Sequence, residues 1–283
     1  MLSDSGADTV SETSSPPLRI GLLVIGDEIL SGKREDRHFA KVVELLRVRG
    51  LRLAWAQYLP DDRDAIAALL RRTFVSDDVV FSCGGIGSTP DDHTRQAAAA
   101  ALDVPLRLHP EAAALIAQRC AQLAAEGRGS ADMNTAENRQ RLKMAEFPAG
   151  ARIVPNPFNQ IAGFAVGNHW FVPGFPVMAW PMIERVLDEH YARRFNLAPQ
   201  AERSLLVFEV AESRIVPLLE ATESRFPGIK TFSLPSVGDG RDGRPARRHI
   251  EVGVKGAAEI IDPAFAWIER GVRELGLDVG SGR

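Results

Sequence analysis

An apolar run that ends in a glycine-rich loop and leads directly into a helix is the most restrictive feature of this chain. Residues 79–81 are apolar, residues 84–87 read Gly-Gly-Ile-Gly, and Ser-Thr-Pro-Asp-Asp-His-Thr follows up to Thr94. We expect a buried strand, a tight turn and a helix N-terminus, so that backbone N–H groups and a positive helix end point to one place. That arrangement suits a phosphate group, and the carboxylates of Asp91 and Asp92 suit a divalent metal ion beside it.

The loop itself supplies the candidate ligand contacts Gly84, Gly85, Gly87, Ser88 and Thr89. Glycine lets the backbone approach a ligand closely and adopt positive φ angles. A plainer interpretation stays open, in which Thr89 caps the helix, Pro90 is its first residue, and Asp91 and Asp92 only complement the helix dipole. The loop is neither a Walker loop, since it lacks Gly-Lys-Ser/Thr, nor a dinucleotide fingerprint.

Strands and helices alternate along most of the chain. Apolar patterns predict strands at residues 19–25, 51–59, 78–83, 162–166 and 169–172, and helices at residues 39–49, 61–76, 91–102, 111–126, 136–145 and 178–195. This order predicts an α/β fold with a doubly wound, mostly parallel sheet. After residue 196 the pattern changes to strands at 205–210, 229–234 and 249–255 and helices at 215–226 and 257–275, which predicts a second, smaller α+β domain.

The predicted domains are therefore residues 18–195 and 196–283, preceded by a disordered polar tail at residues 1–17. The formal net charge of −3 does not indicate a nucleic-acid partner, and no apolar run approaches the roughly 20 residues of a membrane span. Cys83 and Cys120 form neither a disulfide framework nor a metal-ligand spacing, so we expect a cytoplasmic protein and interpret Cys83 as a buried filler.

Acidic residues follow three of the predicted strands, as Asp27 and Glu28, Asp61 and Asp62, and Asp91 and Asp92. The carboxyl ends of parallel strands line one crevice, where ligands bind in open α/β sheets. Helix capping explains each pair singly, with Asp61 as an N-cap, but explains the threefold recurrence less well. Clustered carboxylates near a phosphate indicate Mg²⁺ or another divalent metal, with Asp61, Asp91 and Asp92 as its ligands.

Four segments in order resemble the molybdopterin-binding domain family: residues 26–32 (Gly-Asp-Glu-Ile-Leu-Ser-Gly), 59–62 (Leu-Pro-Asp-Asp), 84–94, and 172–176 (Val-Pro-Gly-Phe-Pro). The family includes proteins of the MoaB/MogA type, the N-terminal domain of CinA and a domain of eukaryotic FAD synthases. The resemblance covers residues 19–190. The unit after residue 196 resembles the extra domain of CinA, and no counterpart of the CinA deamidase domain is expected.

The resemblance implies residue roles and two activities. Asp61 and Asp92 match positions credited with catalysis in adenylylating relatives; Asp27, Gly85, Gly87, Ser88 and Thr89 match ligand contacts; and Pro173 and Gly174 match a second loop flanking the pocket. CinA-type relatives are linked to metal-dependent hydrolysis of ADP-ribose, and FAD synthase relatives to hydrolysis of FAD. The resemblance also implies a homo-oligomer.

This sequence departs from the family pattern where the rest of the ligand would lie. Relatives often carry Asn where His38 stands in Asp36-Arg37-His38, and the segments 156–163 and 177–179 also differ. We interpret His38 and His93 as ordinary polar or capping residues rather than phosphate contacts. Two functions follow: an enzyme that cleaves a nucleotide phosphoanhydride with Mg²⁺, or a module that binds molybdopterin or a related phosphate-bearing ligand without chemistry.

Overall fold

The computed structural model describes residues 18–197, 200–238 and 247–281, and the predicted tail at residues 1–17 lies outside them. The chain divides into two compact units between Phe195 and Asn196. Each unit is described by itself.

The first unit contains a six-stranded sheet that is mostly parallel, which confirms the predicted fold class. Its strand order is β2-β1-β3-β8-β7-β6. Strands β2, β1, β3 and β8 run parallel, while β7 and β6 are antiparallel to their neighbours. The strands are β1 Ile20–Ile25, β2 Leu53–Leu59, β3 Val79–Cys83, β6 Arg152–Val154, β7 Gly163–Val166 and β8 His169–Val172. The edge strand β6 was not predicted, because three residues are too few to show a period.

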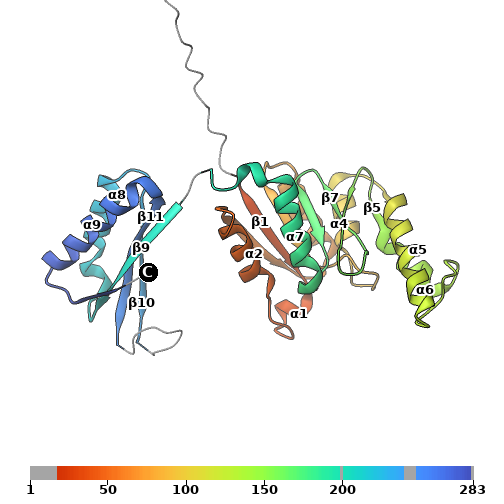
Figure 1. The fold of residues 1–283 in the computed structure, drawn as a ribbon, viewed down its shortest axis with the longest axis horizontal. Coiled ribbons are helices and arrows are strands. Elements are labelled where there is room, and N and C mark those ends of the chain that lie inside the picture. Colours follow the sequence, from red (N-terminus) through yellow and green to blue (C-terminus); the bar gives the residue numbers. More distant parts are fainter. Residues whose placement is uncertain (1–17, 198–199, 239–246, 282–283) are drawn as a thin grey trace, which may run out of the picture. The chain divides into compact units, whose positions relative to one another are not determined.

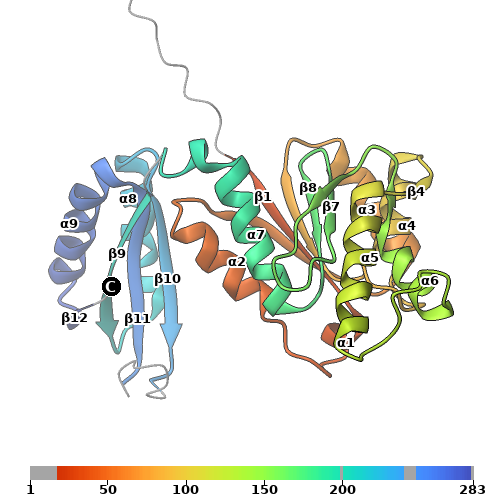
Figure 2. The same cartoon turned by 45° about the vertical axis from the view of Figure 1, so that its right-hand side comes forward.

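Helices cover both faces of this sheet (Figure 2). On one face lie α2 His38–Arg47 and α7 Pro176–His190; on the other lie α3 Arg63–Phe74, α4 Thr94–Leu102 and α5 Pro110–Ala125. The alternation within β1 shows why. Leu22 and Val24 pack toward α2 and α7, whereas Leu23 and Ile25 pack toward α3 and α4, so every residue of β1 is buried.

Several short elements complete the first unit. They are α1 Asp27–Leu30, α6 Ala136–Leu142, the 3₁₀ turns Lys143–Ala145 and Ala192–Arg194, and the two-stranded sheet of β4 Leu106–Leu108 and β5 Glu146–Pro148. Figure 1 shows α5 and α6 beyond α4. Helix α7 ends at His190 rather than at Phe195 as predicted, and it begins with Pro176, whose fixed φ angle suits a first helical position.

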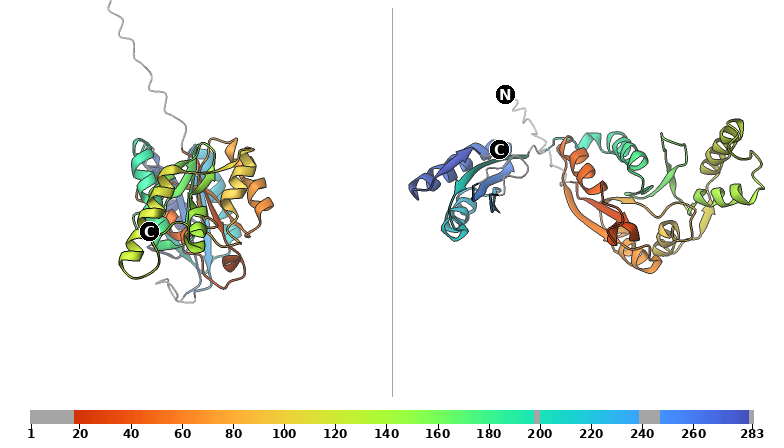
Figure 3. Two further views of the ribbon diagram at one scale, coloured as in Figure 1. Left: turned by 90° about the vertical axis from the view of Figure 1, so that its right-hand side faces the viewer. Right: turned by 90° about the horizontal axis from the view of Figure 1, so that it is seen from below.

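The second unit is an antiparallel sheet with helices on one face (Figure 3). Its strand order is β10-β11-β9-β12, formed by β9 Gln200–Phe208, β10 Lys230–Ser236, β11 His249–Ala257 and β12 Val279–Ser281. Helices α8 Val216–Arg225 and α9 Ala258–Glu274 pack on it, and the 3₁₀ turn Glu212–Arg214 precedes α8. Val207, Val252 and Ile268 lie in the core between them. No helix within the described ranges is both long and apolar enough to cross a bilayer.

Candidate functional site

The loops that follow β1, β3 and β8 meet at the carboxyl edge of the sheet, as parallel neighbours require. The N–H of Gly84, at the end of β3, donates to the carbonyl of Val172 at 3.0 Å, and the N–H of Gly26 donates to the carbonyl of Leu59 at 3.1 Å. Gly174 lies so close to the β3 loop that an added Cβ would be 3.3 Å from the Gly84 Cα. The four segments that carry the family resemblance therefore occupy one edge.

Glycine is required at two positions of the β3 loop. Gly84 and Gly85 have φ angles of 108° and 67°. A Cβ on Gly84 would lie 2.2 Å from the carbonyl oxygen of Ile25, and one on Gly85 would lie 2.2 Å from Thr94 Oγ1. Thr94 anchors the loop from the helix, because its hydroxyl donates to the Gly84 carbonyl and its N–H to the Gly85 carbonyl, both at 3.0 Å.

Asp92 turns back into this loop and accepts the donors that we expected a phosphate to use. Its Oδ1 accepts from the Gly87 N–H at 2.9 Å, and its Oδ2 accepts from the Thr89 N–H at 2.8 Å and from the Thr89 hydroxyl. The hollow of the loop is thus filled in part by a side chain of the protein. The plainer interpretation, in which Asp92 accepts hydrogen bonds from backbone N–H groups, is therefore correct. The N–H groups belong to the loop, however, and not to the first turn of the helix. Helix α4 begins only at Thr94, after His93, so Thr89 is not its N-cap and Pro90 is not its first residue.

Two further side chains hold the same loop and were not predicted. Arg95, only 3% exposed, donates to the Gly87 carbonyl, and the Gln140 amide donates to the Ser88 carbonyl. Burial lowers the pKa of Arg95, an effect opposed by the charges of Asp92 and Glu146. The sequence signal for Arg95 was its position in the alanine-rich helix 94–102. A charged side chain that is buried in such a helix needs a hydrogen-bond partner.

The acidic residues after β1 and β2 pair directly. Asp61 Oδ2 accepts from the Asp27 N–H at 2.9 Å, and Asp27 Oδ1 accepts from the Asp61 N–H at 3.3 Å. Burial raises the pKa of Asp61, and so do the charges of Asp27, Glu28 and Asp91, while the hydrogen bond from Asp27 opposes the rise. The pKa of Asp61 therefore depends on the charges of carboxylates from two other segments, after β1 and after β3.

The N-cap of α3 is Asp62, which accepts from the Ala65 N–H at 2.7 Å, so the interpretation of Asp61 as that cap is wrong. Asp61 is therefore free of a helix-capping role, and its side chain faces the loop after β1 instead.

The predicted metal ligands Asp61, Asp91 and Asp92 are not assembled into a metal site. Within residues 18–197, 200–238 and 247–281 no group of three or more His, Cys, Asp or Glu side chains is placed to hold a metal ion. Asp92 uses both oxygens on backbone donors, and Asp61 uses one. The carboxylates as they stand do not fit a resident Mg²⁺ ion, which takes several oxygen ligands in near-octahedral geometry.

A pocket of about 330 Å³ lies beside the glycine loop, at the ends of β1 and β3. Its lining residues come from these strands, from α1 and the segment that leads to the first residue of α2, and from the loop between β8 and the first residue of α7. They are Val24, Ile25, Glu28, Ile29, Arg34, Glu35, Arg37, His38, Cys83, Gly174 and Pro176. Cys83 is buried, and burial raises the pKa of its thiol, which fits a filler better than a nucleophile.

His38 is a buried residue of the pocket lining, whereas we expected an ordinary polar surface or capping role. Its side chain is 4% exposed, and its Nε2 donates to the carbonyl oxygen of Gly174 at 3.0 Å. It thereby ties the first residue of α2 to the loop after β8, 136 residues along the chain. The sequence signal that could have found it is the departure from the family pattern at Asp36-Arg37-His38.

Comparison with known proteins identifies the family. Residues 21–192 match the family described as "Probable molybdopterin binding domain". This chain belongs to the molybdopterin-binding domain family. The match includes residues from all six strands of the large sheet, so the resemblance read from the four loop motifs is confirmed.

Relatives that are similar in sequence carry the name CinA-like protein. The chain is 35% identical over 207 residues to a CinA-like protein of Citrifermentans bemidjiense and 33% identical over 207 residues to one of Geobacter sp. strain M21, each alignment covering 72% of this chain and 47% of the relative. The chain thus spans about half the length of these curated relatives. A crystal structure of CinA from Thermoplasma acidophilum is similar over 60% of this chain and 98% of its own, at 28% identity and a TM-score of 0.50.

Proposed function

We propose that this protein binds a phosphate-bearing pterin, with molybdopterin as the first candidate, at the carboxyl edge of β1, β3 and β8. The observation that carries the proposal is the convergence of the glycine loop, the Asp27–Asp61 pair and the Gly174 loop at that edge, next to a pocket that Cys83 and Gly174 help to line. A pocket of about 330 Å³ is of the size that small-molecule sites use. The family match to a molybdopterin-binding domain supports the choice of ligand.

In this proposal Asp92 is a positioning residue. It keeps the loop in shape before a ligand arrives, together with Thr94, Arg95 and Gln140. A loop that is ordered in advance costs less entropy to organise on binding. In this proposal the ligand contacts come from the loop residues Gly84, Gly85, Gly87, Ser88 and Thr89 and from Asp27, Pro173 and Gly174. The N–H groups of Gly87 and Thr89 are bonded to Asp92, so the ligand meets a loop that Asp92 already holds in shape.

The test is calorimetric titration of the full chain with molybdopterin under anaerobic conditions. We expect saturable binding by the wild type and at least tenfold weaker binding by Gly85→Ala, whose Cβ would collide with Thr94. The matched control is Gly150→Ala, which replaces a glycine of similar φ, 85°, in open space. No binding by the wild type, or equal losses in both variants, would reject the proposal.

A second candidate function is hydrolysis of a nucleotide phosphoanhydride such as ADP-ribose or FAD. One observation favours it, namely the raised pKa of Asp61 among Asp27, Glu28 and Asp91 at the same edge, since perturbed carboxyl groups cluster at catalytic sites. The measurement is AMP release from ADP-ribose and from FAD, with and without added Mg²⁺. Asp61→Asn should abolish release, and Asp64→Asn, on the exposed first turn of α3, should not. Absence of release in the wild type would reject hydrolysis and leave the binding proposal standing.

Two further parts of this proposal concern the protein as a whole. A cytoplasmic location and a homo-oligomeric state stay predictions of the sequence and the resemblance. Light scattering coupled to size-exclusion chromatography measures the second directly, and a monomer at all concentrations would contradict it.

A further inference from the structure

A second pocket, of about 410 Å³, lies at the opposite end of the sheet from the glycine loop. Arg19 and Asp78 line it, and they directly precede β1 and β3. Helix α3 contributes Leu69 and Arg72, and β2 contributes Trp55. Among the residues that the structure describes, this pocket shares no lining residue with the pocket beside the glycine loop. The Trp55 pocket, as we call it, is therefore a separate cavity, and its volume is typical of small-molecule sites.

The indole ring of Trp55 is held in place on two sides. Its neighbour on β1 is Gly21, and an added Cβ on Gly21 would lie 2.1 to 2.6 Å from three atoms of the ring. The ring thus occupies the space that a side chain at position 21 would need. Its Nε1 donates to Asp78 Oδ2 at 2.7 Å. The ring stays partly exposed and lines the pocket, where it can stack against another flat ring.

The charged groups of the Trp55 pocket consist of one ion pair and one unpaired arginine. Asp78 is 8% exposed, and its Oδ1 pairs with Arg19 Nε at 2.9 Å while its Oδ2 accepts from Trp55. Arg72 is exposed, and within the described part of the chain its guanidinium makes neither a hydrogen bond nor an ion pair. One positive charge of the pocket lining therefore has no partner from the described residues.

The position of Arg72 at the end of α3 has a plainer explanation, because a positive charge there complements the helix dipole. Arg71 lies in the same last turn and serves that role equally. Arg71 also donates to the Ala100 carbonyl at 3.4 Å, and it does not line the Trp55 pocket. The two arginines share the helix end but differ in surroundings, which makes Arg71 the matched control for Arg72.

We propose that the Trp55 pocket binds a flat aromatic ring that carries one anionic group, such as an aromatic carboxylate. The ring stacks against Trp55, and the Arg72 guanidinium binds the anionic group through paired N–H donors. Because Asp78 already engages Arg19, the pocket offers a single cation, which matches a monoanion. This proposal goes beyond the proposed function and does not depend on it, since the two ligands bind at opposite ends of the sheet.

The experiment is calorimetric titration of the full chain with three probes: 2-naphthoate, its neutral analogue 2-naphthamide, and the non-aromatic anion cyclohexanecarboxylate. We expect saturable binding of 2-naphthoate and at least tenfold weaker binding of the other two, because each lacks either the charge or the flat ring. Absence of saturable 2-naphthoate binding, or equal affinity for 2-naphthoate and either analogue, would overturn the proposal.

Three arginine variants locate the anion. Arg72→Gln should weaken 2-naphthoate binding at least tenfold, whereas Arg71→Gln, which removes the same charge from the same helix turn, should leave it within about twofold. Arg37→Gln removes an exposed arginine from the pocket beside the glycine loop and should also leave it within about twofold. Equal weakening by Arg72→Gln and either control would show general charge attraction or the other pocket, and would overturn the proposal.

Trp55 gives a readout at the pocket itself. The chain has four tryptophans, and the indole N–H signal of Trp55 in the NMR spectrum is assigned by its absence from the spectrum of Trp55→Phe. Saturation of the wild type with 2-naphthoate should shift this signal, because a stacked aromatic ring changes the magnetic field at the indole proton. The measurement uses the wild-type fold. An unshifted Trp55 signal at saturation would place the ligand elsewhere and overturn the proposal.

Discussion

At the scale of single residues, the carboxylates of this edge have different tasks although they look alike in sequence. Both carboxylate oxygens of Asp92 accept hydrogen bonds from loop N–H groups. Its neighbour Asp91 is exposed, and its charge raises the pKa of Asp61. Sequence spacing cannot distinguish the two, because the direction of each side chain depends on how the loop closes. Substitutions at the two positions should therefore have separate effects.

We expect Asp92→Ala to lower the free energy of unfolding by about 1–3 kcal/mol, because it leaves the N–H groups of Gly87 and Thr89 without their acceptor. Asp91→Ala should change it by less than about 0.5 kcal/mol, as is usual for exposed positions. Chemical denaturation followed by circular dichroism measures both. Equal losses in the two variants would contradict the assignment of Asp92 as the residue that shapes the loop.

His169 is a buried histidine at the opposite end of the sheet from the site. It is 2% exposed, its Nε2 lies 2.8 Å from Thr73 Oγ1, and its ring lies 4.3 Å from that of Phe74. Burial lowers its pKa to about 4, against a weaker opposing effect of the Asp78 charge. The folded protein thus keeps this ring neutral at pH values where the unfolded chain takes up a proton.

Its contribution to stability is complete above the ordinary histidine pKa of about 6.5 and is lost as the pH falls from there toward 4. Between pH 7 and pH 5, His169 alone should lower the free energy of unfolding by about 2 kcal/mol. Unfolding by urea at the two pH values tests it, with His169→Gln as the variant that cannot titrate. If the wild type and the variant lose the same free energy of unfolding over this pH interval, His169 makes no contribution to the pH dependence of stability.

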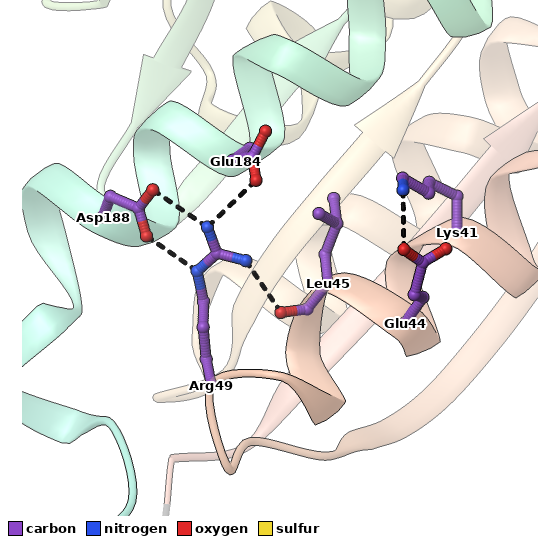
Figure 4. Close-up of polar contacts among 6 residues, drawn as sticks. All are labelled: Lys41, Glu44, Leu45, Arg49, Glu184 and Asp188. Carbon is purple, nitrogen blue, oxygen red and sulfur yellow. Dashed lines mark hydrogen bonds and ion pairs between the residues drawn. The ribbon is translucent and has the colours of Figure 1, made fainter.

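At the scale of elements, helices α2 and α7 are joined by one arginine (Figure 4). Arg49, just beyond the end of α2, donates from Nε and Nη2 to the two Asp188 oxygens at 2.7 and 2.9 Å, from Nη2 to Glu184 at 3.3 Å, and from Nη1 to the Leu45 carbonyl at 3.0 Å. The hydrogen bond from Arg49 lowers the pKa of Asp188. This clamp fixes the two helices whose N-terminal ends border the pocket.

Asp188→Asn should cost about 1–2 kcal/mol of unfolding free energy, because it removes a two-point contact to a largely buried guanidinium. The control is Glu189→Gln on the same helix. Glu189 pairs with Arg185 across one exposed turn, a type of ion pair that contributes only about 0.3–0.5 kcal/mol. Thermal unfolding at low and high salt distinguishes the effects of the two variants, since salt screens the exposed Arg185–Glu189 pair more strongly than the Arg49–Asp188 pair. Similar effects of both variants would mean that the clamp adds nothing beyond surface charge.

At the scale of the whole molecule, each unit has a core of its own. The first unit has apolar clusters on both faces of its sheet, and the second has one cluster between its sheet and the helices α8 and α9. Strand β12 completes the second sheet by pairing with β9, so residues 279–281 belong to that unit.

We therefore expect residues 18–195 and residues 196–283 to fold when they are produced separately. Each fragment should show cooperative thermal unfolding by circular dichroism, and the first alone should retain the binding of molybdopterin. A second fragment shortened at residue 278 should be less stable, because β9 would lose its partner at one edge. A fragment without a cooperative transition would contradict the independence of the two units.

Much of the architecture could be predicted from local patterns. The apolar runs at residues 19–25 and 79–83 require strands buried on both faces, and the helical periods between them require a layer on each side, which leads to the parallel sheet and its carboxyl edge. The short strands β4, β5, β6 and β12 were not predicted, because each has three residues, too few to show a periodic pattern. Their strand character comes from their neighbours.

The sequence by itself determined which loops reach the ligand edge and that glycine and aspartate gather there, because strand direction and chain order are local properties. Only the tertiary structure decided that Asp92 closes the loop, that Asp61 lies against Asp27, and that His38 is buried against Gly174. These contacts join residues up to 136 positions apart and depend on side-chain direction and on which strands are neighbours. No pattern within a window of sequence encodes that geometry.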